Sequence, residues 1–224
     1  VQELNQADSA LGSATSSLSR ARELAVSASG DTDSAESLEE MSVEVATLKE
    51  ELVRIANSRS NSRYLFAGTA SDASAYTDAG VYQGNDGVRQ VIAGEDYTLD
   101  VSLTGDEIFG TASGGVDIFD ALDRLEAAMK ADDRPAIEAL LTDLDAGLDQ
   151  VIHSRTVYGA RSNQATELRS FYEQQEVASI ERVSLDEDAD VASAYTDLAR
   201  LNTTLQATLQ VSATATRLSL LDYL

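Results

Sequence analysis

Few residues in this sequence have the type and spacing that catalysis requires. His153 is the single histidine, and it lies between Ile152 and Ser154 in a stretch with helical periodicity. A serine next to a histidine on one helix does not form a triad, and no nucleophile-elbow motif is present. A histidine on an ordinary helix surface is the simpler interpretation, so we predict no catalytic residue and no enzyme activity.

Two acidic stretches could suggest a metal site. Residues 186–190 read Asp-Glu-Asp-Ala-Asp, and residues 84–87 read Gly-Asn-Asp-Gly. The first stretch lacks the spaced ligands and the central glycine of a calcium loop, and carboxylates at a helix start complement the helix dipole. The second stretch is explained by a turn. Because cysteine and a phosphate-binding glycine loop are also absent, we predict no metal and no cofactor.

The composition limits the possible partners. The 224 residues carry a net charge of −23, with 39 acidic and 16 basic residues. Such a field repels nucleic acid and anionic lipid, and no run of about 18 apolar residues is present to span a membrane. Alanine and leucine supply most of the apolar content, and Pro135 is the single proline, which favours long, closely packed helices. We therefore predict neither nucleic acid nor a membrane as a partner.

Helical periodicity dominates the first part of the chain. Apolar residues recur at steps of three and four, as in a coiled-coil seam. A short link near residues 30–32 predicts that the first two helices are antiparallel neighbours, and Asp33 with Glu36 is expected to cap the second. The seam positions are Leu4, Ala7, Leu11, Ala14, Leu18, Ala21, Ala25 and Ala28 in the first helix, and Leu38, Met41, Val45, Leu48, Leu52 and Ile55 in the second.

The period changes after residue 63, where glycines separate short aromatic and β-branched runs. The Asp-Gly pair within residues 84–87 predicts a hairpin between residues 81–83 and 88–92. A second turn leads into residues 97–103, and a third turn is expected at residues 104–106. These runs predict a small sheet of three or four strands that packs on the helices.

The helical period returns in the second half of the chain. Asp117 is expected to cap a short helix that ends near Lys130, and Asp133 is expected to start the longest helix. Ser184 and Glu187 have the spacing of a capping box and predict the start of a separate last helix. The predicted fold is therefore mainly α, an elongated antiparallel heptad-patterned bundle that carries a short antiparallel β-hairpin or sheet subdomain. The predicted parts are residues 1–63 (first part of the helical rod), 64–116 (β insert) and 117–224 (second part).

The end of the chain has an unusual composition for a solvent-exposed helix. Residues 203–216 are rich in Thr, Ala and Gln, and residues 203–224 are predicted to be an assembly-directed helix that is buried against another chain or segment. Tyr64, Leu65 and Phe66 are expected to anchor the insert on the bundle. The predicted assembly residues are Leu198, Leu201, Leu205, Leu209, Leu218, Leu221, Tyr223 and Leu224.

Several motifs together resemble one family. Residues 61–69, Asn-Ser-Arg-Tyr-Leu-Phe-Ala-Gly-Thr, follow an acidic heptad helix and resemble the FlgL-type hook-associated proteins, which form the flagellar hook–filament junction. Residues 81–87 and 104–110 resemble the β segment of that family. Residues 158–163, Tyr-Gly-Ala-Arg-Ser-Asn, resemble a helix motif that it shares with flagellin, and residues 205–207 and 218–224 resemble its C-terminus.

The resemblance implies a structural protein with a flagellin-like helical core. Members of the family leave the cell through the flagellar export apparatus, without a cleaved signal peptide, and lie outside the cell in the flagellum. The implied partners are other copies in a ring or layer, hook-associated protein one, flagellin and, before secretion, an export chaperone. The family's N-terminal helical segment is expected to be absent, because the sequence starts within a helical pattern.

Two alternatives remain open. The first is a short flagellin that forms the filament itself, although residues 64–68 and the ending Ser-Leu-Leu-Asp-Tyr-Leu favour the junction family. The second is a metal-binding or enzymatic module on a helical scaffold, for which the sequence offers no suitable residues.

Overall fold

The computed structural model describes residues 1–30, 34–94, 97–112 and 114–221, which form two units, Val1–Leu168 (unit 1) and Arg169–Leu224 (unit 2). Unit 1 contains α1 (Gln2–Ala28), α2 (Ala35–Ala56), α3 (Gly105–Phe109), α4 (Ile118–Lys130) and the first part of α5 (Arg134–Leu221). It also contains four short strands. All described residues of unit 2 belong to α5.

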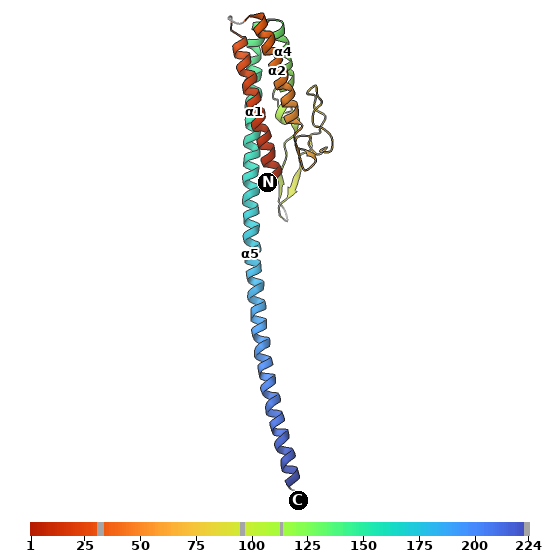
Figure 1. Cartoon of the computed structure of the whole chain (residues 1–224), viewed down its shortest axis with the longest axis vertical. Coiled ribbons are helices and arrows are strands. Elements are labelled where there is room, and N and C mark those ends of the chain that lie inside the picture. Colours follow the sequence, from red (N-terminus) through yellow and green to blue (C-terminus); the bar gives the residue numbers. More distant parts are fainter. Residues whose placement is uncertain (31–33, 95–96, 113, 222–224) are drawn as a thin grey trace. The chain divides into compact units, whose positions relative to one another are not determined.

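Four helical segments of unit 1 form an antiparallel bundle. α1, α2, α4 and the first part of α5 lie side by side and alternate in direction (Figure 1). All eight seam residues predicted for α1 are at most 2% exposed, and on α2 Leu38, Val45 and Leu52 are completely buried. Met41, Leu48 and Ile55 pack partly buried against the same core. The predicted antiparallel, heptad-patterned bundle is confirmed.

The helix starts depend on side-chain caps. Asp117 accepts two backbone N–H groups of the first turn of α4 at 3.0 and 3.1 Å, which confirms its predicted role. Asp133 accepts one at the start of α5 at 3.1 Å, as expected. Asp33 lies outside the described residues, and the cap of α2 is Ser34, whose Oγ accepts a backbone N–H at 3.2 Å.

The predicted start of a separate last helix at Ser184 is wrong. α5 continues from Arg134 to Leu221 without interruption. A capping box starts a new helix only where the preceding helix has ended. Residues 176–191 contain neither glycine nor proline, the residues that most disfavour a helix interior, so the helix does not end here. Serine and glutamate at this spacing are equally compatible with an exposed helix interior.

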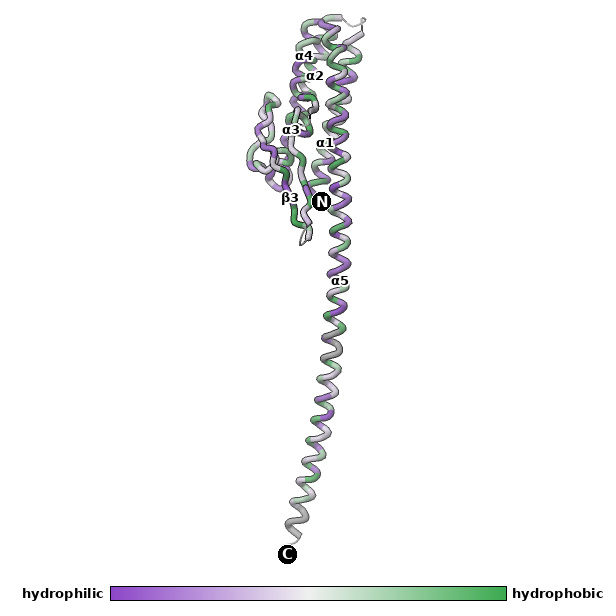
Figure 2. The backbone as a smooth tube through the Cα atoms, turned by 180° about the vertical axis from the view of Figure 1, so that it is seen from behind, coloured by the Kyte–Doolittle hydropathy of each residue, from purple (hydrophilic) through white to green (hydrophobic). Residues whose placement is uncertain are grey.

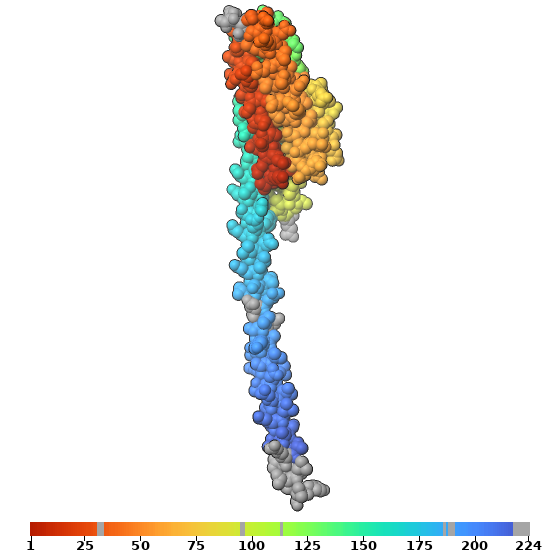
Figure 3. Space-filling view, in the orientation of Figure 1, coloured from red at the N-terminus to blue at the C-terminus, as the bar shows by residue number. Residues whose placement is uncertain are grey.

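Residues 59–100 contain two separate hairpins, the first of which begins before the predicted insert boundary at residue 64. β1 (Arg59–Ser60) pairs with β2 (Arg63–Tyr64), and β3 (Gln90–Ile92) pairs with β4 (Thr98–Asp100), both antiparallel. Asn61 and Ser62, with φ of 47° and 71°, form the turn of the first hairpin, and positive φ at both central residues is typical of a type I′ turn. The insert packs against the end of α2 (Figure 3). A small antiparallel β subdomain is confirmed, but as two sheets of two strands.

The predicted hairpin across residues 84–87 is wrong. Residues 81–83 do not pair with residues 88–92, because Asn85 turns this loop toward Thr69 instead. Asn85 Oδ1 accepts the N–H groups of Thr69 at 2.8 Å and Gly87 at 3.1 Å. The backbone of Asn85 also lies against Gly68, where a Cβ atom would stand 2.2 Å from the Asn85 carbonyl oxygen.

The predicted turn at residues 104–106 is instead the start of a helix. Thr104 Oγ1 accepts the Glu107 N–H at 3.3 Å, and Glu107 Oε2 accepts the Thr104 N–H at 3.0 Å. This pair is a reciprocal capping box, and it opens the short helix α3. Glycine at position 105 suggested a turn, but the Thr-x-x-Glu spacing determined the local structure.

Candidate assembly surface

The described side chains of unit 2 are exposed along its whole length, and a subset of the hydrophobic ones recurs at steps of three and four residues. Figure 2 shows hydrophobic residues recurring along the described part of this helix. We call the six most regular members the apolar stripe, and each is more than half exposed. The apolar stripe consists of Val191, Tyr195, Leu198, Leu201, Leu205 and Leu209.

The apolar stripe occupies one continuous face of the helix. At 3.6 residues per turn, its six positions cover an arc of about 120°. Asp197 and Arg200 are the charged residues between positions 191 and 209, and the same geometry places both outside the arc. Residues 201–216 contain no charged residue, although the chain has a net charge of −23. This segment therefore combines a wide apolar face with an uncharged remainder.

The threonines in this part of the helix satisfy their own hydroxyl groups. Thr196, Thr203, Thr204 and Thr208 each donate to the backbone carbonyl four residues earlier, at 2.7 to 2.9 Å. A hydroxyl that is bonded inside its own helix can be buried without a new polar partner. Thr208, which lies just beside the arc of the stripe, can therefore be buried at an interface despite its hydroxyl group.

A long helix with no packing partner is unstable in water unless its apolar face is covered. Helices in proteins obtain most of their stability from tertiary packing of that face. Contiguous exposed apolar surface of this kind is typical of a protein interaction site. The geometry of unit 2 therefore favours helix-to-helix packing with another chain or segment.

The structure brings the first four predicted assembly residues onto this surface. Leu198, Leu201, Leu205 and Leu209 lie on the stripe, 56 to 67% exposed. The backbones of Leu218 and Leu221 belong to α5, whereas Tyr223 and Leu224 lie outside the described residues. The sequence-based set omitted Val191 and Tyr195, although their heptad spacing with Leu198 already indicated the same face.

The predicted insert anchor lies where the insert meets the helices. Leu65 and Phe66 are buried, and Tyr64 is partly buried against the same core. The Phe66 ring makes edge contacts with Phe109 at 5.9 Å and with Tyr158 of α5 at 6.4 Å between centroids. Tyr76 and Phe119 extend this group, 4.9 Å apart. The aromatic cluster thus joins the insert, α3, α4 and α5 in one core.

Polar side chains hold the insert backbone to the helices. Asn57, just after α2, donates to the Tyr76 carbonyl and accepts the Tyr76 N–H, both at 2.9 Å. Gln150 of α5 donates to the carbonyls of Ile108 at 3.0 Å and Gly110 at 2.8 Å, and accepts the Val116 N–H at 3.1 Å. Each of these amides replaces a missing backbone partner of an irregular segment.

The motif at residues 158–163 has a direct structural role in the chain. Tyr158 Oη accepts the Leu103 N–H at 3.0 Å, and Arg161 donates to the Ser102 carbonyl at 2.7 Å. Two residues one turn apart on α5 therefore hold the segment that follows β4. Tyr158 lies on the bundle face and is 1% exposed, whereas Arg161 is partly exposed.

Burial changes the acidity of the tyrosines around this core. Burial raises the pKa of Tyr158 to about 12, and it also raises the pKa of Tyr82 to about 12. The pKa of Tyr76 is raised further by burial, and its hydroxyl has no hydrogen-bond partner among the described residues. All three phenols stay neutral at physiological pH, which is consistent with a packing role.

The residues considered for chemistry are dispersed. His153 is exposed on α5 beside a hollow of about 450 Å³ that Glu107 and Asp149 also line. Within the described ranges, no three His, Cys, Asp or Glu side chains are grouped closely enough to hold a metal ion. The described helices include none with the length and apolar content needed to cross a membrane.

Comparison with known proteins identifies the helical region. Residues 1–71 match the family of the bacterial flagellin N-terminal helical region. This match covers α1, α2, the first hairpin and the insert anchor. A search of curated protein sequences gave no match.

The fold is shared with solved flagellar proteins. FlgL from Xanthomonas campestris is similar with a TM-score of 0.74 and 19% identity, over 82% of this chain and 94% of that one. The flagellar junction protein FlgL from Legionella pneumophila has a TM-score of 0.66 and 17% identity, over 80% and 90%. Flagellin from Bacillus cereus has a TM-score of 0.53 and 23% identity, over 75% and 84%. Residues 1–71 are therefore similar to the flagellin N-terminal helical region, and the chain shares its fold with these FlgL structures.

Proposed function

We propose that this chain, a flagellin-related protein with the FlgL-type fold, is a structural subunit of the bacterial flagellum. In this role it joins the hook-associated layer to the flagellin filament. The observation that carries the proposal is the exposed apolar stripe of unit 2, on a chain whose unit 1 forms its own bundle core. A structural subunit needs this division between a self-contained body and a surface completed by its neighbours.

The proposed mechanism is helix-to-helix packing between subunits. Burying a leucine or valine side chain contributes roughly 1.5–3 kcal/mol. Five such positions on one face, together with Tyr195, supply a large driving force, part of which offsets the entropy lost on association. Thr208 lies beside the apolar stripe, and its hydroxyl, which is bonded inside the helix, leaves no stranded polar group when this face is buried. The role is structural and involves no catalytic step.

The proposed partners follow from this position. They are other copies in a ring or layer, hook-associated protein one on one side, flagellin on the other, and an export chaperone before secretion. The proposed location is outside the cell, after passage through the flagellar export apparatus without a cleaved signal peptide. The proposed parts are residues 1–63 and 117–224 for the helical rod, residues 64–116 for the insert and residues 203–224 for the assembly-directed segment.

Gene deletion and complementation test the proposal. Cells without this gene are expected to build hooks and to release flagellin monomers into the medium, because the filament has no foundation. Returning the gene should restore filaments, as seen by electron microscopy. Normal filaments in the deletion strain would contradict the junction role.

A short flagellin is the second candidate, because the family model that matches residues 1–71 describes the N-terminal helical region of flagellin. The same strain separates the two functions. If the chain forms the filament, the deletion strain releases no filament monomer, and the protein is the main component of sheared filaments. If the chain forms the junction, it is a minor component found at the filament base.

A further inference from the structure

The arginine and lysine side chains of unit 1 are almost all neutralised by acidic neighbours. The exceptions are Arg54, Arg59 and Arg63, which form no ion pair with any described residue. Every other lysine and arginine of residues 1–168 lies within 4.0 Å of a carboxylate. These paired side chains are Arg20, Arg22, Lys49, Arg89, Arg124, Lys130, Arg134, Arg155 and Arg161.

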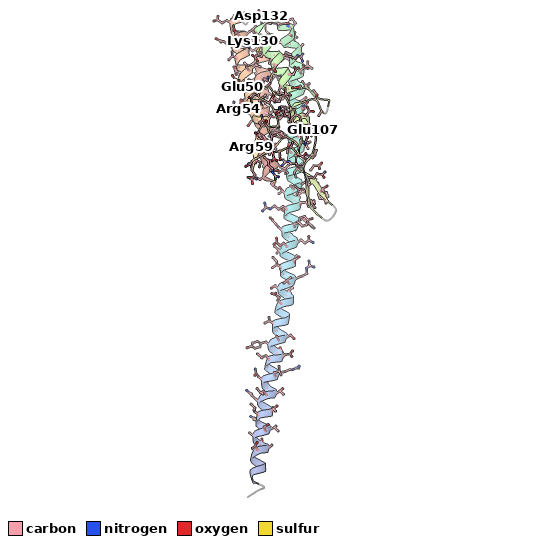
Figure 4. All side chains as sticks on the ribbon, turned by 90° about the vertical axis from the view of Figure 1, so that its right-hand side faces the viewer. Glu50, Arg54, Arg59, Glu107, Lys130 and Asp132 are labelled. Carbon is pink, nitrogen blue, oxygen red and sulfur yellow. The ribbon has the colours of Figure 1, made fainter. Side chains whose placement is uncertain are left out.

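The three exceptions lie close together in sequence and structure. Arg54 is in the last turn of α2, and Arg59 and Arg63 belong to the two strands of the first hairpin. All three are exposed, and Figure 4 shows Glu50, Arg54 and Arg59 following one another along one edge of unit 1. We call these three residues the arginine patch.

Local contacts orient the patch but leave its charge available. The Arg59 guanidinium lies 4.4 Å from the centre of the Tyr64 ring, a cation–π contact that holds it over the hairpin. Arg54 lines a hollow of about 370 Å³ with Glu50 and Asp78, which compensate part of its charge from beyond ion-pair distance. Arg59 and Arg63 therefore carry most of the uncompensated charge.

The opposite end of α2, where the helix begins, carries negative charge that complements the arginine patch. Glu36, Glu39 and Glu40 lie in its first two turns, are exposed, and form no ion pair with a described residue. Along α2, these carboxylates lie about 21–27 Å from Arg54 of the arginine patch, at 1.5 Å per residue. One copy thus presents a basic end and an acidic end on the same helix.

We propose that the arginine patch of one copy docks on the acidic start of α2 in a second copy. This inference rests on the proposed function, in which copies pack against one another. A second copy is the fitting partner because the start of its own α2 supplies exposed carboxylates that match the arginine patch. A contact between two different surfaces is heterologous, so it repeats from copy to copy and suits a ring or layer.

Cross-linking of paired cysteines tests this contact in the full chain, which contains no native cysteine. Ser62→Cys at the hairpin tip and Ser37→Cys at the start of α2 are joined by a short bismaleimide at low ionic strength. We expect intermolecular cross-links in a mixture of the two variants. Ser62→Cys mixed with Ser9→Cys, on the exposed part of α1, serves as the matched control and is expected to give at least tenfold fewer.

Charge changes distinguish docking from random collision. Arg59→Glu with Arg63→Glu is expected to lower the Ser62–Ser37 cross-link yield at least tenfold, and about 1 M salt should do the same because it shortens the Debye length to about 3 Å. Arg182→Glu with Arg200→Glu makes the same change in net charge in unit 2 and should leave the yield unchanged. Adding Glu39→Arg and Glu40→Arg to the Ser37→Cys partner should restore the cross-link to the Arg59→Glu, Arg63→Glu copy.

Equal yields for the Ser37 and Ser9 partners, or a yield that resists both salt and charge reversal, would overturn the contact. The proposed function is judged separately by gene complementation. Filaments restored fully by the Arg59→Glu, Arg63→Glu protein would refute the contact and leave the junction role intact. Specific cross-links in a protein whose deletion leaves filaments unaffected would refute the junction role and retain the contact.

Discussion

At the scale of single residues, Phe66 makes the connection between the insert and the bundle. It is completely buried and contacts aromatic rings from α3 and from α5. Phe66→Ala removes these contacts and leaves a cavity, so the free energy of unfolding should fall by about 3–5 kcal/mol. Urea denaturation followed by circular dichroism measures this loss. Phe171→Ala, at an exposed phenylalanine of unit 2, is the control and should change the value by less than about 0.5 kcal/mol.

The buried phenol of Tyr158 predicts a loss of stability at alkaline pH. Its pKa is about 12 in the folded chain and about 10 in an unfolded chain. Between these values the unfolded state releases the proton and the folded state keeps it, so stability is full below pH 10 and falls as the pH rises toward 12. Tyr158→Phe should reduce this fall by about 2–3 kcal/mol, although it also lowers stability at neutral pH through the lost bond to Leu103. An unchanged pH slope in urea titrations would show that this phenol does not titrate differently on folding.

Sequence reasoning reached some of these residues but not their contacts. The apolar run at residues 64–66 indicated an anchor, and the structure places Leu65 and Phe66 in the core. Phe66, Phe109 and Tyr158 are far apart in the sequence, so no local pattern predicts that their rings meet. The amide of Gln150 was not singled out for the same reason, since its partners lie about 40 residues earlier.

At the scale of elements, heptad spacing predicted the bundle correctly, whereas short turn sequences led to wrong predictions in the β region. The seams of α1 and α2 are buried as expected because apolar side chains on one helix face have few alternatives to packing. The hairpin expected at residues 84–87 failed because an Asp-Gly turn competes weakly with the hydrogen bonds that Asn85 makes to Thr69. Such tertiary contacts determine whether a turn sequence forms the hairpin that it predicts.

The continuity of α5 through Ser184 gives a prediction at this scale. If Ser184 capped a helix, Ser184→Ala would cost about 1 kcal/mol and lower the helix content. In a continuous helix the substitution replaces an exposed interior serine by the best helix former and should leave the helix content equal or slightly higher. Circular dichroism at 222 nm before and during thermal unfolding measures the difference. Asp117→Ala, at the cap of α4, is the positive control and should lower stability.

At the scale of the whole molecule, the chain divides its hydrophobic residues between two tasks. In unit 1 most of them form one core, and in unit 2 those described are exposed, six of them on the apolar stripe. The unusual composition of residues 203–216 indicated this second task in the sequence. The sequence did not show that the stripe begins at Val191. Apolar residues have the same spacing on a helix packed inside a bundle and on a helix whose apolar face is exposed.

The account depends most on the claim that the apolar stripe is the assembly interface. Leu198→Glu with Leu205→Glu places two charges on the stripe, and we expect the secreted variant to fail to restore filaments in the deletion strain. Thr196→Glu with Thr203→Glu is the matched control, because each lies two residues earlier, about 160° around the helix. The decisive measurement is the number of filaments per cell by electron microscopy, with equal secretion verified. The account predicts filaments with the control and none with the stripe variant, and equal numbers for both variants would contradict it.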